Sequence, residues 1–302
     1  MKRPRVNPMG LVAIGPSLPQ MMMVNTQCQA TTTRRLKART KSMNASRRPG
    51  LTGGGSEPVG EPLVRSSAMA RARRWWPIAA IVLALVVTNV ASNRVVPNSW
   101  YAPFAVVISV ALVAFAVRVD GRSLHDLGLA RSQAPRGARW GLAVGAAVVL
   151  IYLAGLALPL TRDLFQDERV ADLSFLDTLY AAFVRVPVGT VLLEEVAFRA
   201  VLPAVLLART RLWVAVSVSA VLFGLWHIFP AIGLEEVNPV AEDTVGQLPA
   251  WVTVAGAVAS TTVSGLWLYF LRHRSGSVLA PMIAHWSTNG LGYLFAFAVW
   301  RG

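Results

Sequence analysis

Long apolar stretches separated by short polar segments fill the chain from Trp75 to its end. A helix needs about 20 consecutive apolar residues to cross the hydrocarbon core of a bilayer. The first two stretches are short by this measure, and the fourth is long enough to tilt or to begin outside the membrane. The pattern predicts an all-α, polytopic transmembrane helical bundle of about seven spans, at residues 75–92, 101–118, 140–160, 178–208, 212–230, 249–271 and 277–300.

The composition agrees with a membrane protein. Hydrophobic residues make up 54% of the 302 residues, charged residues make up 15%, and the mean hydropathy is +0.50. An ordinary soluble domain is less apolar and carries more charge. The single cysteine, Cys28, excludes an intramolecular disulfide and a cysteine-based metal site.

Residues 1–74 differ from the rest of the chain. They hold 14 of the 29 Lys and Arg residues but only two acids, and they lack sustained apolar periodicity. Pro, Gly, Ser, Thr and Arg dominate, which predicts a basic, disordered segment ahead of a membrane domain at 75–302. Such a tail can bind anionic lipid, while nucleic acid is not the expected partner. It can also be simply solvated, or lie upstream of a true start at Met43 or Met69.

Arginines mark alternate polar segments. They precede the first span and follow the second, fourth and sixth, whereas the other connections hold few arginines or are acidic. Since cytoplasmic loops are enriched in Lys and Arg, this distribution predicts a multi-pass cell-membrane protein with a cytoplasmic N-terminus and an external C-terminus. The residues are Arg71, Arg73, Arg74, Arg122, Arg131, Arg136, Arg139, Arg209, Arg211, Arg272 and Arg274.

Three of the predicted spans carry polar side chains that are candidates for function. The fourth holds Glu194, Glu195 and Arg199, the fifth holds His227, and the seventh holds His285 and Asn289. A charged group at mid-bilayer costs several kcal/mol, so it usually faces a partner or a water-filled cavity. Asn89 and Arg185 lie nearer to span ends, from which they could reach the interface.

The two adjacent glutamates have different expected roles. Residues four apart share a helix face, so Glu195 can pair with Arg199. Glu194 points about 100° away and lacks this partner. A carboxylate deprived of water and of a cation suits general-base catalysis near neutral pH. We therefore expect Glu194 to be the base and Glu195 to be structural; the alternative is that both belong to a buried salt-bridge network.

The histidines have neighbours at the same helical spacing. Phe223 shares a face with His227 and would shape the wall of a pocket around its ring, while His285 shares a face with Asn289. The last two side chains could donate hydrogen bonds to one oxyanion. Each histidine alone could instead be a satisfied core residue. A common site requires tilted helices or shifted span ends, because the predicted depths of Glu194, His227 and His285 differ.

In these motifs the chain resembles the CPBP family of intramembrane proteases, which includes type II CAAX prenyl endopeptidases and abortive-infection or bacteriocin-processing proteins. The family pattern of EExxxR, FxxxH and HxxxN reads here EEVAFR (194–199), FGLWH (223–227) and HWSTN (285–289). The resemblance covers roughly residues 100–300 and leaves out the basic segment.

The resemblance implies a helical membrane peptidase with its site in a cavity open to the cytoplasmic side, acting on peptides or on membrane-anchored protein termini. Glu194 and His227 would activate water, His285 and Asn289 would stabilise the oxyanion, and Glu195, Arg199 and Phe223 would support them. A metal-free mechanism is favoured, with no cofactor. Zinc held by Glu194, His227 and His285 remains the alternative.

Other functions are less consistent with the sequence. The chain has no HExxH motif, no rhomboid-type GxSG and no paired intramembrane aspartates. It also shows no internal repeat, which argues against an inverted-repeat transporter. A non-catalytic immunity, regulatory or scaffold protein is the main alternative. The acidic segment 231–248, with Glu235, Glu236, Glu242 and Asp243, could select a basic substrate or be a solvated loop.

Overall fold

The computed structural model describes residues 62–232 and 248–301, with side chains from Arg74 onward. The segment that carries Glu235 to Asp243 and the N-terminal 61 residues lie outside the described part, so the expectations for them stay predictions. The described residues form helices and no strand. In order these are α2 (Pro62–Arg94), η1 (Asn98–Trp100), α3 (Tyr101–Arg118), η2 (Arg131–Gln133), α4 (Ala134–Ala157), α5 (Pro159–Arg162), η3 (Asp163–Phe165), α6 (Glu168–Ala171), α7 (Phe175–Tyr180), η4 (Ala181–Val191), α8 (Leu192–Glu195), η5 (Val196–Val201), α9 (Leu202–Leu207), α10 (Leu212–Trp226), α11 (Ile228–Ala231), α13 (Ala250–Ser275) and α14 (Leu279–Arg301).

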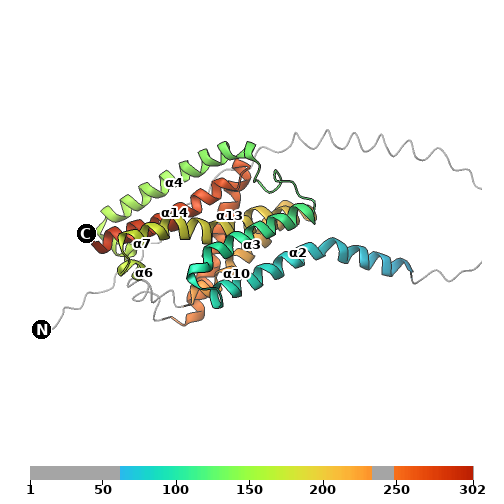
Figure 1. The fold of residues 1–302 in the computed structure, drawn as a ribbon, viewed down its shortest axis with the longest axis horizontal. Helices are drawn as coiled ribbons and strands as arrows, with labels where there is room; N and C mark the ends of the chain where they lie inside the picture. Colours follow the sequence, from blue (N-terminus) through green and yellow to red (C-terminus); the bar gives the residue numbers. More distant parts are fainter. Residues whose placement is uncertain (1–61, 233–247, 302) are drawn as a thin grey trace, which may run out of the picture. The chain divides into compact units, whose positions relative to one another are not determined.

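The all-α bundle is confirmed (Figure 1). Fewer of its helices are long and apolar enough to cross a membrane than the seven predicted. Within the described residues, four helical segments are long and apolar enough to cross a membrane: Arg74–Arg94, Asn98–Arg118, Arg131–Ala157 and Ala250–Ser275. Helix α10 is apolar but shorter. The other two predicted runs correspond to α14 and to a broken helix that contains α8.

Helix α2 spans the predicted boundary at residue 74, and that domain boundary stays a prediction. Helix α2 begins at Pro62, inside the segment predicted to be disordered, and continues without interruption to Arg94. Proline is well suited to the first turn of a helix because its missing N–H has no partner there anyway. The following residues to Arg74 are rich in Ala and Arg, which favour helix.

The broken helix from α7 to α9 forms the centre of the bundle. Two π-helical segments, η4 and η5, flank the single α-helical turn of α8. Pro187 lies within η4, where it removes a helical hydrogen bond. Nearly every residue from Val191 to Leu206 is buried, so this helix is covered by protein on all sides. Wide turns of this kind are frequent at functional sites, and here they bracket Glu194 and Glu195.

Glycines bring α4 against α14. Gly137, Gly141 and Gly145 are spaced four apart on α4 and are buried. A Cβ added at Gly141 would lie 2.7 Å from Cβ of Ile283, and one at Gly145 would lie 2.8 Å from Oγ of Ser287. Small residues at this spacing allow the backbones of two membrane helices to approach closely. The stripe thereby fixes the position of α14, the helix that bears His285 and Asn289.

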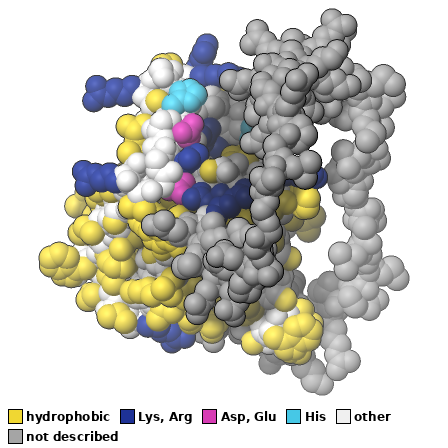
Figure 2. Space-filling view, turned by 90° about the vertical axis from the view of Figure 1, so that its right-hand side faces the viewer, with side chains coloured by type: hydrophobic (Ala, Val, Ile, Leu, Met, Phe, Trp, Pro, Cys, Tyr) yellow, Lys and Arg dark blue, Asp and Glu magenta, His cyan; other side chains and the backbone are white. Residues whose placement is uncertain are grey.

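The arginine-bearing connections meet at one end of the bundle. Arg209, after α9, bonds to the backbone of Arg74 on α2 and to the carboxylate of Asp120 after α3. Arg136 at the start of α4 donates to the backbone carbonyl of Arg274 at the end of α13. Figure 2 looks onto this end and shows arginine side chains gathered there above the apolar flank. The sequence correctly grouped these connections on one side.

Candidate functional site

The three motifs converge on one point in the interior. Glu194 lies on α8, His227 is the residue that ends α10, and His285 lies on α14. The Oε2 atom of Glu194 is 4.0 Å from Nε2 of His227 and 3.9 Å from Nε2 of His285. The predicted mismatch in depth is absent, because α10 stops at Trp226 and its last residues therefore lie deep in the bundle.

Glu194 has one bonded and one free carboxylate oxygen. Its Oε1 accepts a 3.1 Å hydrogen bond from Nε1 of Trp226. Its Oε2 is buried and has no hydrogen-bond partner among the described residues. The residue is only 4% exposed, yet it lines the main cavity. An ionised oxygen in this position needs a polar partner, which water or a substrate group can supply.

His227 presents a lone pair to Glu194. Its Nδ1 lies 2.8 Å from the backbone carbonyl oxygen of Phe223. A carbonyl can only accept, so Nδ1 carries the proton and Nε2 of the neutral ring is an acceptor. The ring of Phe223 meets the imidazole edge-on, with centroids 4.6 Å apart, and restricts its rotation. Phe223 does not itself line the main cavity, but it orients the histidine through its ring and its backbone.

Beside the contacts of Glu194 with Trp226 and His227, a second series of contacts starts at Glu195. Oε1 of Glu195 lies 3.3 Å from Nη1 of Arg199 and accepts a 2.8 Å bond from Nδ1 of His285. With that proton on Nδ1, Nε2 of His285 accepts from Nδ2 of Asn289 at 3.1 Å. The pairing of Glu195 with Arg199 is therefore observed. The hydrogen bond from His285 to Glu195 joins the third motif to the first, a connection that helical spacing within one motif does not reveal.

Arg199 is enclosed by protein. Glu195 is completely buried, Arg199 is 2% exposed, and the guanidinium carbon lies 3.8 Å from the centroid of the Phe223 ring. A guanidinium over an aromatic face gains a cation–π attraction that grows when water is excluded. Phe223 therefore takes part in both series of contacts: the arginine of the first motif stacks on it, and its backbone holds His227.

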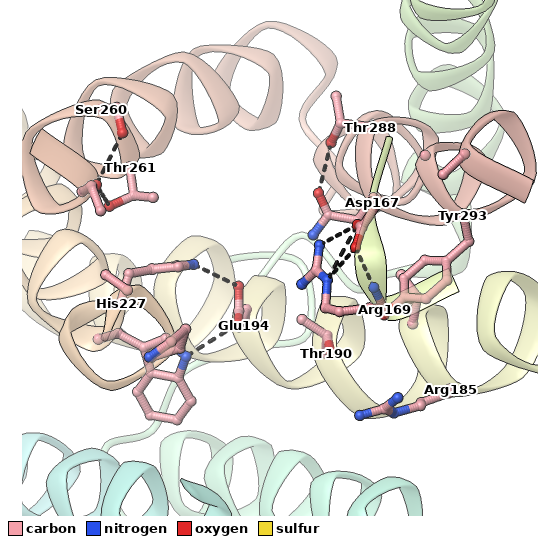
Figure 3. A pocket seen from close by; sticks show the side chains of 18 of the residues that line it. Asp167, Arg169, Arg185, Thr190, Glu194, His227, Ser260, Thr261, Thr288 and Tyr293 are labelled. Carbon is pink, nitrogen blue, oxygen red and sulfur yellow. Dashed lines mark hydrogen bonds and ion pairs between the residues drawn. The ribbon is translucent and has the colours of Figure 1, made fainter. Parts of the chain in front are cut away.

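A cavity of about 1050 Å³ reaches this point from one end of the bundle. Glu194, His227 and Asn289 line its inner part, and Figure 3 shows Glu194 and His227 facing each other across it. Toward the mouth, Arg169 is paired with Asp167 at 2.6 Å. This hydrogen bond raises the pKa of Arg169 above its ordinary value, so the guanidinium stays ionised. His285 itself does not line the cavity.

Sequence reasoning missed one residue of the site, Trp226, and assigned two others, Asn89 and Arg185, to positions nearer the interface. Trp226 directly precedes His227, and its indole N–H was not recognised as the partner of Glu194. Asn89 was expected near the interface, but it is buried and donates to the carbonyl of Trp226 at 2.8 Å. Helix ends leave carbonyls unpaired, and Asn89 satisfies one at the end of α10. Arg185, also expected near the interface, lines the cavity.

The spacing of the polar atoms bears on the zinc alternative. No group of three or more His, Cys, Asp or Glu residues in the described ranges has the geometry of a metal site. Ligands about 2.1 Å from a tetrahedral zinc lie about 3.4 Å from one another. The separations of 4.0 and 3.9 Å from Glu194 Oε2 are wider than this. They suit a water that makes hydrogen bonds of ordinary length, about 2.8 Å, to both sides.

Comparison with known proteins identifies the family of the segment that contains the site. Residues 176–291 match the family described as Type II CAAX prenyl endopeptidase Rce1-like. No curated protein and no solved structure matches the chain. The matched segment contains all three motifs, so the resemblance is confirmed over a range narrower than the predicted 100–300. At the level of the family, it indicates a CAAX-type protease in a membrane.

Proposed function

We propose that the protein is an intramembrane endopeptidase that hydrolyses a peptide bond with water activated by Glu194 and His227. The observation that supports this most is the meeting of two acceptors on one side of a large cavity. Oε2 of Glu194 and Nε2 of His227 face each other at 4.0 Å, too far for a direct hydrogen bond and well spaced for one water between them.

Such a water would be oriented for attack. Its two protons point at Glu194 and His227, which leaves an oxygen lone pair directed into the cavity. As that oxygen attacks the scissile carbonyl carbon, one proton passes to Glu194 and the carbonyl oxygen becomes an oxyanion. When the tetrahedral intermediate collapses, the C–N bond breaks and Glu194 returns its proton to the leaving amine. General acid–base transfer of this kind contributes about 10²- to 10⁴-fold in rate.

Asn289 is the donor best placed for the oxyanion. Its amide nitrogen has two hydrogens, and the bond to His285 uses one of them. The other can point into the cavity that Asn289 lines. His285, which in its neutral form accepts at Nε2, then acts as a positioning residue. We therefore assign the two partners unequal roles, in place of the equal donation expected from the sequence.

Glu195 and Arg199 support this arrangement from behind. Glu195 contacts Arg199 and accepts the hydrogen bond from Nδ1 of His285, which leaves Nε2 of that ring free to hold Asn289. We propose that no metal takes part, because Glu194 is needed as the base and the polar atoms are spaced for water. The purified enzyme should keep its rate in EDTA and in 1,10-phenanthroline, and a loss that zinc restores would contradict this step.

The function is tested by comparing peptide termini in two otherwise identical strains. One strain expresses the unaltered chain and the other Glu194→Ala, at matched membrane levels, and mass spectrometry lists the termini found only in the first. Termini that depend on Glu194 support a protease and identify its substrate class. If both sets are identical although the protein is folded and its substrates are present, the endopeptidase proposal fails and a regulatory or scaffold role replaces it.

A further inference from the structure

The cavity and the arginine-bearing connections lie at opposite ends of the bundle. At its mouth the cavity is lined by Asn98 between α2 and α3, by Arg169 of α6, and by Pro230 of α11. The arginine end consists of the connections 119–133 and 208–211 and of the last turn of α13 with the residues 276–278 that follow it, and no cavity-lining residue in the described part of the chain belongs to these segments. Each long helix runs between these two ends, as α3 does from Tyr101 to Arg118.

Charge is distributed very unequally between the two ends. Among the described residues, the arginine end carries ten arginines and two acids: Arg74, Arg118, Arg122, Arg131, Arg136, Arg139, Arg209, Arg211, Arg272 and Arg274, with Asp120 and Asp126. The cavity end carries five arginines and five acids: Arg94, Arg162, Arg169, Arg185 and Arg301, with Asp163, Asp167, Glu168, Asp172 and Asp177. Short loops rich in Lys and Arg stay in the cytoplasm.

From this separation we infer that the cavity opens on the extracytoplasmic side of the membrane, so that the substrate is a polypeptide that has already crossed it. The family resemblance implied a cytoplasmic opening, whereas the arginine distribution predicted a cytoplasmic N-terminus. The two cannot both hold here, because α2 enters the bundle at the arginine end and the cavity opens at the other. The charge distribution is a property of this chain, so it decides between them.

The cavity has the size and lining for a peptide segment. Ligand pockets usually have volumes of about 300–1,000 Å³, and this one has about 1050 Å³. Its wall contains aromatic side chains such as Tyr152 and Tyr293 and polar ones such as Thr253 and Ser260. An exported peptide, or the external segment of a membrane protein, can therefore reach Glu194 without crossing the bilayer. This substrate class rests on the proposed function, whereas the side of the opening does not.

Single cysteines test the side of the opening. With the native thiol removed by Cys28→Ser, Ser260→Cys places a thiol in the cavity and Ser132→Cys places one at the arginine end. A membrane-impermeant maleimide is added to intact cells and, separately, to permeabilised cells. We expect Ser260→Cys to be labelled in intact cells and Ser132→Cys only after permeabilisation. The reverse pattern, or labelling of Ser260→Cys only after permeabilisation, overturns the inference.

Two further arms separate this inference from the proposed function. Asn98→Cys, exposed at the mouth of the cavity, repeats the test if the thiol in Ser260→Cys reacts under neither condition. Adding Glu194→Gln to Ser260→Cys should leave the labelling unchanged, because it removes the base and not the opening. If labelling places the cavity outside but no external terminus depends on Glu194, the topology stands and the substrate class falls.

Discussion

The Nδ1 atom of His285 lies 2.8 Å from Oε1 of Glu195, so one buried hydrogen bond joins the first and third motifs. The same carboxylate oxygen faces Arg199, while Nε2 of the same imidazole faces Asn289. Adjacent glutamates thus serve two separate chains of contacts. Glu194 faces the cavity. Glu195 connects the buried Arg199 to His285, which in turn holds Asn289.

Removing the charge of Glu195 should destabilise the protein more than it alters the chemistry. Glu195→Gln keeps an acceptor for His285 but leaves Arg199 without a counter-ion in a buried site. Breaking one partner of a buried pair costs about 3–5 kcal/mol, whereas replacing both partners by apolar groups is far less costly. Denaturation in detergent should show this loss for Glu195→Gln, with recovery in the double variant Glu195→Gln/Arg199→Met. A single variant as stable as the unaltered protein would contradict the pairing.

The indole of Trp226 should contribute to catalysis through its N–H. Trp226→Phe keeps an aromatic ring but removes the donor to Oε1 of Glu194. A hydrogen bond to a charged group is worth about 1.5–3 kcal/mol, so kcat should fall by roughly 10- to 100-fold. Trp213→Phe is the matched control, because Trp213 lies on the same helix and is largely exposed. Equal rates for the two variants would exclude a role for the indole N–H.

Asn289 should affect kcat more than KM. Asn289→Ala removes the amide that faces the cavity, and loss of one oxyanion donor lowers kcat by about 10²- to 10³-fold. Ser287→Ala, on the same helix but facing α4, is the control for local packing. Steady-state kinetics on the peptide found from the cellular termini separate the two parameters. An effect of Asn289→Ala on KM alone would indicate substrate binding in place of transition-state stabilisation.

The glycine stripe of α4 should be needed to keep α14 in place. Gly141→Leu forces side-chain atoms into Ile283 and should lower both the unfolding temperature and the activity, because α14 carries His285 and Asn289. Gly256→Ala is the matched control, since a Cβ at that position of α13 meets nothing within 4 Å. Alanine there should be neutral or slightly stabilising. Unchanged unfolding of Gly141→Leu would show that the two helices are not packed as described.

The sequence revealed the helical class, the grouping of the arginine-bearing connections and the motif residues, because each depends on short-range spacing or composition. The pairing of Glu195 with Arg199 is present even though the backbone between them is partly π-helical. The sequence did not reveal that the apolar run at 178–208 forms the buried central helix of the bundle. Hydropathy cannot distinguish a helix that faces lipid from one that is covered by other helices.

Long-range contacts account for the residues that were missed. Trp226 reaches Glu194 only because α10 ends at that residue, and a helix end inside an apolar run has no clear sequence signal. Asn89 bonds to the same tryptophan across 137 residues of chain. Neither contact follows from the spacing within one motif, which is all that a single sequence offers without an alignment.

The central claim is that Glu194 takes a proton from water, and the most direct test is the cleavage rate of purified Glu194→Gln. This variant keeps the size of the side chain and an oxygen for Trp226, but it cannot act as a base. We predict a loss of about 10²- to 10⁴-fold in kcat with an unfolding temperature close to that of the unaltered protein. A Glu194→Gln protein that cleaves the same peptide at the full rate would contradict the account.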